Sequence, residues 1–319
     1  MSALYPFIPG RQADAFIDEK TSGMITTSQV APATRPMRRA SHIRGNEMEI
    51  PFTKLHGNGN DFVLIDEYEK TVIPDDLKAQ FAALYCDRRF GIGADGILYL
   101  SKSTTSDIRM RIFQPDESEA EMCGNGVRCL ARYALDAGYV KESFTVETQA
   151  GAVGVSARYT DEEFTATISM PEPKFEKKEI PATGDGEYHE RIGEFEVYAV
   201  NTGVPHAVVL VDSVDSVDIG AAAPPIRHHA AFPEGANVNF VEKTGDDSLR
   251  IRTFERGVEE ETLSCGTGAT ASAAVVRHLG HMKDTIHVET RGGPLTISFG
   301  DGVKMEGPAV TVFSGVIRY

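Results

Sequence analysis

The chain has 319 residues, of which 41% are hydrophobic and 25% charged, as is usual for a soluble globular protein. This length allows two domains, each with its own core. The net charge of −15 and a pI near 5.1 argue against nucleic acid or an anionic membrane as a partner. No apolar stretch is long enough to span a bilayer, so we expect no membrane partner.

The first 47 residues differ in composition from the rest. They hold four prolines and a basic cluster, with little periodicity. Asp14, Asp18 and Glu19 fit a transit peptide badly, and no apolar signal region is present. We therefore expect residues 1–47 to form a disordered extension. Because patterned sequence begins near Met48, a further hypothesis is that Met48 is the true start, which native mass spectrometry would test.

From Met48 onward, short strands and helices are predicted in alternation. In the first half the apolar pattern predicts a helix over 76–85 and strands over 62–65, 97–100, 109–113 and 144–147. In the second half it predicts strands over 207–211 and 250–254. The turn Pro171-Glu172-Pro173 gives the best boundary between the halves.

One unit of sequence occurs twice. Cys123-Gly-Asn-Gly and Cys265-Gly-Thr-Gly are separated by 265 − 123 = 142 residues, and a similar order of residues follows each phrase. The strands before them, 109–113 and 250–254, are separated by 254 − 113 = 141 residues. This pattern is typical of a diverged internal duplication, in which each half presents one cysteine.

Each of these two cysteines is predicted to precede a helix. Apolar residues recur at helical intervals after both, and Gly138 and Gly280 supply C-terminal stops. The N–H groups and dipole at a helix N-terminus favour a thiolate and can hold a carboxylate. The alternative is that Cys123 and Cys265 are inert, buried residues, a common use of cysteine.

The other two cysteines fit that structural interpretation better. Cys129 lies inside the first predicted helix, and the matching position of the repeat is Ala271. Cys86 has no counterpart in the repeat. None of the four cysteines forms a zinc-type C-x-x-C pair, so we expect no metal site and a reducing, cytoplasmic location.

Several separated motifs from about Met48 to the C-terminus resemble the diaminopimelate epimerase family. They are, in chain order, 55–63 (LHGNGNDFV), 91–96 (GIGADG), 118–126 (SEAEMCGNG), 203–206 (GVPH), 254–257 (FERG) and 265–268 (CGTG). Their order makes the resemblance specific, whereas either short cysteine phrase alone would be weak.

The resemblance implies an α/β (α+β) fold of two similar domains. Each would be a curved, mainly antiparallel sheet around a central helix, with the active site in the interdomain cleft. We expect residues 48–169 and the C-terminal strand 306–319 to form the first domain and residues 170–305 the second. The resemblance also implies a homodimer, no cofactor and diaminopimelate as the small-molecule substrate in lysine biosynthesis.

It further implies roles for individual residues. Asn60, Asn237, Glu255 and Arg256 would contact the substrate, with Arg256 on its distal carboxylate. His206 and Glu255 would tune the two thiols. Read without the resemblance, Glu255 and Arg256 could form a surface ion pair, the asparagines could serve turns, and His206 could be a simple hydrogen-bonded residue.

Three departures from the family pattern bear on substrate contacts. Gln114 stands where many relatives have Asn, which keeps the amide but extends it by one methylene, so Gln114 remains a candidate contact. Val204 replaces an Asn found in some relatives and offers no polar side chain. The segment between Gly257 and Cys265 is one residue longer than in the shorter family version.

Inverting an α-carbon requires a base on one face and an acid on the other, and two cysteines suit these roles. With no electron sink evident, we assign stabilisation of the reacting carboxylate to backbone N–H groups at the helix N-termini, those of Gly124, Asn125, Gly266 and Thr267. The rival hypotheses are a proline racemase-like enzyme, a dithiol redox protein and a non-catalytic binder. Activity on proline with none on diaminopimelate would favour the racemase. Consumption of reductant in each turnover would favour the redox protein, and undiminished function of Cys123→Ala would favour the binder.

Overall fold

The computed structural model describes residues 48–319. The expectations for residues 1–47 therefore lie outside the described part. Within it, the strands of the first half are β1 (Glu49–Gly57), β2 (Asn60–Asp66), β3 (Gly96–Ser101), β4 (Ile108–Phe113), β5 (Glu119–Ala120), β6 (Ser143–Thr148), β7 (Gly151–Thr160) and β8 (Glu163–Met170). Its helices are α1 (Lys78–Tyr85) and α2 (Gly124–Asp136).

The second half repeats this order. After β9 (His189–Ile192) come β10 (Phe195–Asn201), β11 (Pro205–Leu210), α3 (Ile219–Arg227), β12 (Asn237–Lys243), β13 (Ser248–Phe254), β14 (Glu261–Thr262), α4 (Gly266–His278), β15 (Thr285–Thr290), β16 (Gly293–Gly300) and β17 (Gly302–Pro308). The last strand is β18 (Val310–Arg318).

Strand pairing is the same in both halves. In the first, β2 is parallel to β3 and β4 is parallel to β6, and the other pairs are antiparallel. In the second, β11 is parallel to β12 and β13 to β15, again among antiparallel pairs. The prediction of two similar, mainly antiparallel halves is confirmed.

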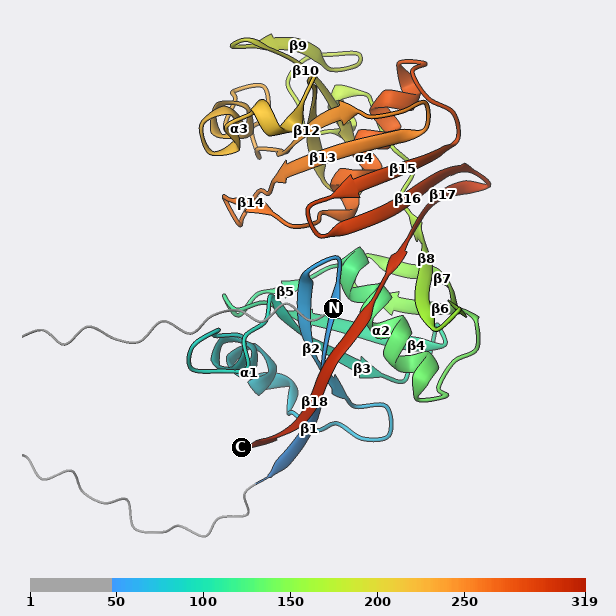
Figure 1. The fold of residues 1–319 in the computed structure, drawn as a ribbon. Coiled ribbons are helices and arrows are strands. Elements are labelled where there is room, and N and C mark those ends of the chain that lie inside the picture. The colour runs from blue at the N-terminus through green and yellow to red at the C-terminus, as the bar shows by residue number, and fades with distance from the viewer. Residues whose placement is uncertain (1–47) are drawn as a thin grey trace, which may run out of the picture. The chain divides into compact units, whose positions relative to one another are not determined.

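Two strand pairs connect the halves. β8 pairs antiparallel with β17, with Met170 opposite Val303, so the backbone ladder continues from one half to the other. β18 then runs antiparallel to β1, with Ile317 opposite Ile50, as the red and blue strands in Figure 1 show. The final strand of the chain therefore completes the sheet that the first strand begins.

The central helices begin and end as predicted. Each starts at the glycine after its cysteine, and each ends before a glycine with positive φ, +74° at Gly138 and +75° at Gly280. Tyr139 N–H donates to Ala134 O at 2.9 Å, and His281 N–H donates to Val276 O at 3.1 Å, the closing bonds of a glycine C-cap. Each helix packs against strands of its own half and buries an apolar face there.

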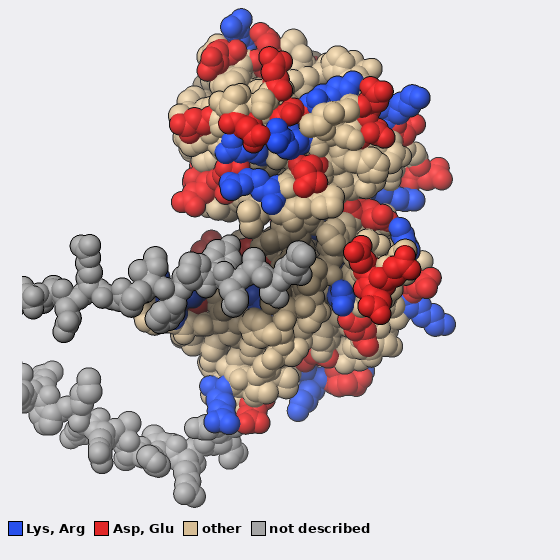
Figure 2. Space-filling view, viewed as in Figure 1, with Lys and Arg blue, Asp and Glu red and all other residues tan. Residues whose placement is uncertain are grey.

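The remaining helices are shorter. α1 begins two residues later than predicted because Asp75–Leu77 forms a 3-10 turn before it. α3 carries Pro224 and Pro225 and is capped by the Asp218 carboxylate, which accepts from Ala221 N–H at 3.3 Å. Among residues 48–319, no helix is long and apolar enough to cross a membrane. Figure 2 shows acidic and basic side chains interspersed on one face of the molecule.

Candidate active site

Cys123 is the N-cap residue of α2. Its backbone is extended, with φ −143° and ψ 117°, and its side chain is partly exposed. The backbone N–H groups of Asn125 and Gly126 donate toward the sulfur, as free donors at a helix start can do. The prediction that this cysteine precedes a helix is thus confirmed in its geometry.

Cys265 holds the equivalent place before α4. Its backbone is also extended, with φ −117° and ψ 110°, and its side chain is buried. Gly268 N–H donates toward its sulfur, and the hydroxyl of Thr267 lies 3.4 Å from it. A built Cβ at Gly268 would lie 3.3 Å from the Cys265 sulfur, so glycine leaves that sulfur room.

Asn125 links the two helix starts. Its amide nitrogen donates to Asn60 Oδ1 at 3.1 Å and to the carbonyl of Ser264, the residue before Cys265, at 3.2 Å. Cys123 Sγ lies 3.5 Å from the same Asn60 Oδ1. Asn60 is held there because the two-residue turn of Asn58 (φ 53°) and Gly59 (φ 83°) joins β1 to β2.

Burial dominates the electrostatics of both thiols. It raises the pKa of Cys123 against the lowering effect of the backbone N–H groups of Gly126 and Asn125, while the Glu255 charge raises it further. Burial also raises the pKa of Cys265, again with Glu255 adding to the effect. Burial raises the pKa of Glu255 as well. One carboxylate therefore acts on both thiols.

The predicted residues of the second half lie on adjacent strands. His206 on β11 is opposite Asn237 on β12 and is fully buried. Burial and the charge of Arg256 lower the pKa of His206 to about 3, so its imidazole is neutral. Its Nδ1 lies 3.0 Å from Asn239 Nδ2, and its Nε2 has no hydrogen-bond partner among the described residues.

Glu255 and Arg256 lie directly after β13. Thr262 Oγ1 donates to Glu255 Oε1, and Asn237 Oδ1 accepts from Arg256 N–H at 2.8 Å. The Arg256 guanidinium donates to the carbonyl of Glu234 at 3.1 Å. Within residues 48–319 the two side chains form no ion pair with each other, so the surface ion-pair alternative is not what this structure has.

Gln114 and the other two cysteines lie apart from the residues around Cys123 and Cys265. Gln114 is exposed, and its Oε1 accepts from Ser118 Oγ at 2.8 Å, a contact within its own turn. Cys129 and Cys86 are buried in two apolar clusters, as the structural interpretation of both expects. Burial raises the pKa of Cys86 to about 12, which leaves it a neutral thiol.

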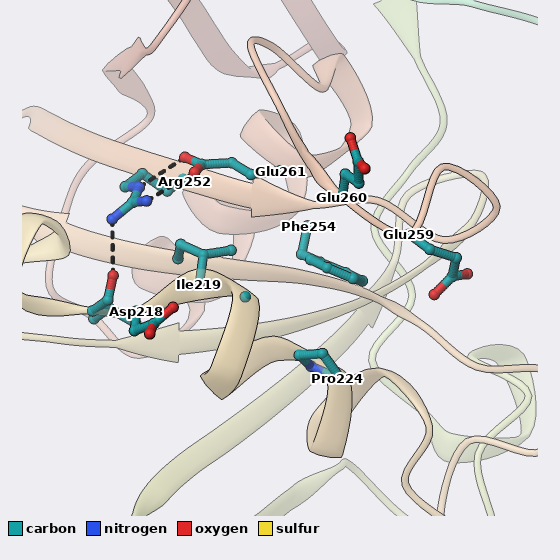
Figure 3. A pocket seen from close by; sticks show the side chains of 10 residues that line it. Asp218, Ile219, Pro224, Arg252, Phe254, Glu259, Glu260 and Glu261 are labelled. Carbon is teal, nitrogen blue, oxygen red and sulfur yellow. Dashed lines mark hydrogen bonds and ion pairs between the residues drawn. The ribbon is translucent and has the colours of Figure 1, made fainter. Parts of the chain in front are cut away.

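Two cavities lie away from the thiols. The first, of about 420 Å³, lies beside α3 and is drawn in Figure 3, where Arg252 pairs with Glu261 at 2.7 Å. The second, of about 580 Å³, lies between α3 and the β9–β10 hairpin. Neither is lined by a predicted site residue. Across residues 48–319, no group of His, Cys, Asp or Glu is arranged to hold a metal ion.

Sequence reasoning misses two charged residues that contact the asparagines at the site, Arg128 on Asn125 and Asp95 on Asn60. Arg128 is fully buried within α2, where the sequence predicts a largely apolar run. Asp95 accepts from Asn60 Nδ2 at 2.6 Å. A charge at a core-facing helical position is the signal that could have pointed to Arg128. Asp95 stands in the GIGADG motif, whose residues receive no individual role from the sequence.

Comparison with known proteins decides the family. The family model for diaminopimelate epimerase matches residues 52–175 and 198–312. The diaminopimelate epimerase of Methanothrix thermoacetophila is 55% identical over 271 residues, which cover 84% of this chain and 96% of that relative. The chain belongs to the diaminopimelate epimerase family. As a member, it is an isomerase.

Solved structures agree with this family's fold. A Bacillus anthracis phenazine biosynthesis protein of the PhzF family superposes with a TM-score of 0.63 at 16% identity, covering 85% of this chain and all of that one. A hydroxyproline epimerase from Agrobacterium vitis gives a TM-score of 0.59 at 19% identity, covering 85% and 92%. At these identities the likeness shows the fold alone.

Proposed function

We propose that this protein is a diaminopimelate epimerase that interconverts LL- and meso-2,6-diaminopimelate in lysine biosynthesis, with no cofactor. Family membership and the 55% identity to a relative of that name support the reaction. The observation that carries the mechanism is the pair of thiols at two helix N-termini, linked through Asn125.

In the proposed reaction the two sulfurs work on opposite faces of one α-carbon. A thiolate removes the α-proton, and the other sulfur, as a thiol, donates its proton to the opposite face. The bond from carbon to the first hydrogen breaks as the new one forms, and the two cysteines exchange protonation states. Because one sulfur is protonated when the other is not, the two thiols titrate as a coupled pair, and no single pKa belongs to either cysteine.

The carbanion-like charge needs stabilisation where it develops. The N-termini of α2 and α4 supply backbone N–H groups of Gly124, Asn125, Gly266 and Thr267 for the reacting carboxylate. Asn60, Asn237 and Arg256 are the proposed contacts for the rest of the substrate. In the proposed complex Arg256 exchanges its bond to the Glu234 carbonyl for a two-pronged grip on the distal carboxylate.

The test is proton NMR of the reduced full-length protein with LL-diaminopimelate in heavy water. Deuterium entry at the α-carbon together with appearance of the meso form supports the epimerase. Exchange on proline but not on diaminopimelate would move the assignment to a proline racemase-like enzyme. Consumption of one reductant per turnover, without exchange, would move it to a redox protein.

We also infer a cytoplasmic homodimer. All four cysteines are free thiols, which supports a reducing compartment. On β18, Val312, Phe313 and Val316 are exposed, and β18 pairs with β1 alone among the described strands, which supports a second copy at this edge.

The domain limits proposed from sequence, 48–169 with 306–319 and 170–305, would be tested by limited proteolysis.

A further inference from the structure

Four side chains form a continuous hydrogen-bond line that contacts Cys123 at Asn60. Arg128 Nη2 donates to Asn125 Oδ1 at 3.0 Å, and Asn125 Nδ2 donates to Asn60 Oδ1 at 3.1 Å. Asn60 Nδ2 then donates to Asp95 Oδ2 at 2.6 Å. The four residues come from α2, from the start of β2 and from the position before β3.

The two ends of the hydrogen-bond line fix its direction. A guanidinium can only donate, and an ionised carboxylate can only accept. Arg128 therefore requires the oxygen of the Asn125 amide, and Asp95 requires the nitrogen of the Asn60 amide. The positions of oxygen and nitrogen in both amides follow from these two ends.

Both ends make further hydrogen bonds, the Arg128 end within the core and the Asp95 end at the surface, where the Asp95 side chain is 43% exposed. Arg128 is fully buried, and it also donates to Asn58 Oδ1 at 2.7 Å and to Pro308 O at 3.2 Å. Built Cβ atoms at Gly57 and Gly307 would lie 3.1 and 3.2 Å from its guanidinium, so two glycines make room for it. At the other end, Asp95 Oδ1 accepts from Arg88 at 2.7 Å, and Asp95 Oδ2 accepts from Asp61 N–H at 3.1 Å.

The direction of the hydrogen-bond line determines what Cys123 meets. With its nitrogen committed to Asp95, Asn60 turns its oxygen toward Cys123 Sγ, 3.5 Å away. An amide oxygen accepts a hydrogen bond from a thiol and repels a thiolate. We propose that Asp95 is a positioning residue that, through Asn60, keeps Cys123 in its protonated form in the substrate-free enzyme, with Arg128 orienting the Asn125 amide from the other end.

The repeat shows that this arrangement is not required by the fold. The position equivalent to Arg128 is 128 + 142 = 270, and Thr270 there donates only to Gly266 O within its own helix. Cys265 instead has the Glu255 carboxylate and the Thr267 hydroxyl beside it. The hydrogen-bond line therefore belongs to one thiol, and, resting on the proposed function, it makes the two acid/base sulfurs of the reaction inequivalent.

Other groups also act on Cys123. The Arg128 charge and the N–H groups at the start of α2 favour its thiolate, whereas burial and the Glu255 charge after β13 favour its protonated form. A variant that removes Asp95 removes a negative charge as well as the orienting acceptor. A second variant must therefore remove the oxygen that faces Cys123 and leave that charge.

The experiment follows alkylation by iodoacetamide against pH, with mass spectrometry resolving Cys123 from the other cysteines. Only the thiolate reacts, so the midpoint reports ionisation and the plateau at high pH reports access. Asp95→Asn allows the Asn60 amide to turn, and Asn60→Ala removes the oxygen while keeping Asp95. Both should lower the midpoint, so that Cys123 reacts roughly tenfold faster below it, as a midpoint one pH unit lower would give.

Arg128→Met should act in the opposite sense. Asp95 still fixes Asn60, and the thiolate loses a nearby cation, so Cys123 should react more slowly below the midpoint. General loosening of the structure would instead speed reaction in every variant. The control for loss of a carboxylate is Asp66→Asn. Asp66 lies on β2, as Asn60 does, and accepts from the Tyr139 hydroxyl at 2.7 Å. The control for loss of a guanidinium is Arg132→Met, one turn after Arg128 in α2.

An unchanged Cys123 midpoint in both Asp95→Asn and Asn60→Ala would overturn the proposal. The measurement needs no turnover, so its failure is distinct from failure of the proposed function. If the midpoints move as expected but the protein does not epimerise diaminopimelate, the role of the hydrogen-bond line is supported and the proposed reaction is wrong. If the protein epimerises diaminopimelate and the midpoints are unchanged, the proposed reaction is supported and the role of the hydrogen-bond line is wrong.

Discussion

Gly124 and Gly266, the first residues of the two central helices, pack against the same side chain. A Cβ built on Gly124 would lie 2.7 Å from Met305 Cε, and one built on Gly266 would lie 2.9 Å from it. Met305 comes from β17, the strand that pairs with β8 of the first half. One thioether thus sets how closely both helix starts approach.

We expect Gly124→Ala to destabilise the protein by about 1–3 kcal/mol, because the added methyl overpacks a full core. Met305→Ala should relieve that contact, so the double variant should lose less than the sum of the single variants. Urea unfolding of the four proteins in a double-mutant cycle measures this coupling. Additive losses would show that Met305 does not limit the approach of α2.

Cys123→Ser and Cys265→Ser should each abolish epimerisation, since both stereochemical directions need both sulfurs. Deuterium exchange and formation of the meso isomer, followed by NMR, check this. Cys129→Ala is the matched control: it lies in α2 and becomes the alanine found at the equivalent position 271. Full turnover by either serine variant would refute the two-base scheme.

Glu255→Gln should move the alkylation midpoint of Cys265 to lower pH. The Glu255 charge raises the pKa of this thiol, so its neutralisation lowers that pKa and makes the thiolate available sooner. Glu260→Gln, in the same loop and exposed, serves as the control. A midpoint that stays put or rises in Glu255→Gln would mean that Glu255 does not act on Cys265 through its charge.

His206 should make the folded protein sensitive to acid. Its pKa is about 3 in the folded state against 6.5 for a free imidazole, so the unfolded chain binds more protons between these values and stability falls as pH decreases from about 6.5 toward 3. Each pH unit within this window costs up to roughly 1.4 kcal/mol of the free energy of unfolding. His206→Asn should show a flatter decline in urea midpoint from pH 7 to pH 4. Parallel curves for the two proteins would contradict this.

The repeated unit explains why much of the fold could be predicted. Helix starts after Cys123 and Cys265 and their glycine stops are local signals, and the structure has both helices where those signals place them. α3 could not be predicted in this way, because Pro224 and Pro225 normally end helices. It forms because Asp218 caps it and because Ile219 and Ile226 are buried in an apolar cluster of the second half that includes Val209 and Phe240.

The site was harder to predict than the fold. Which residues surround a thiol depends on contacts between distant segments, such as Asn60 with Cys123 and Asn125 with Ser264. The resemblance to the family pointed to Asn60, and the helix N-terminus pointed to the backbone of Asn125, but neither pointed to Arg128 or Asp95, whose effects depend on the direction of hydrogen bonds. That direction exists only once α2, β2 and β3 have been brought together.

The pairing of β18 with β1 has a consequence for synthesis of the chain. The core around Ile50 also contains Ile317, so the half of the protein made first cannot close its sheet until β18 is made. The second half, whose strands β10 to β17 are contiguous in sequence, faces no such delay. On the ribosome the order of completion is therefore reversed, and the β1 edge stays open to wrong partners until β18 has emerged.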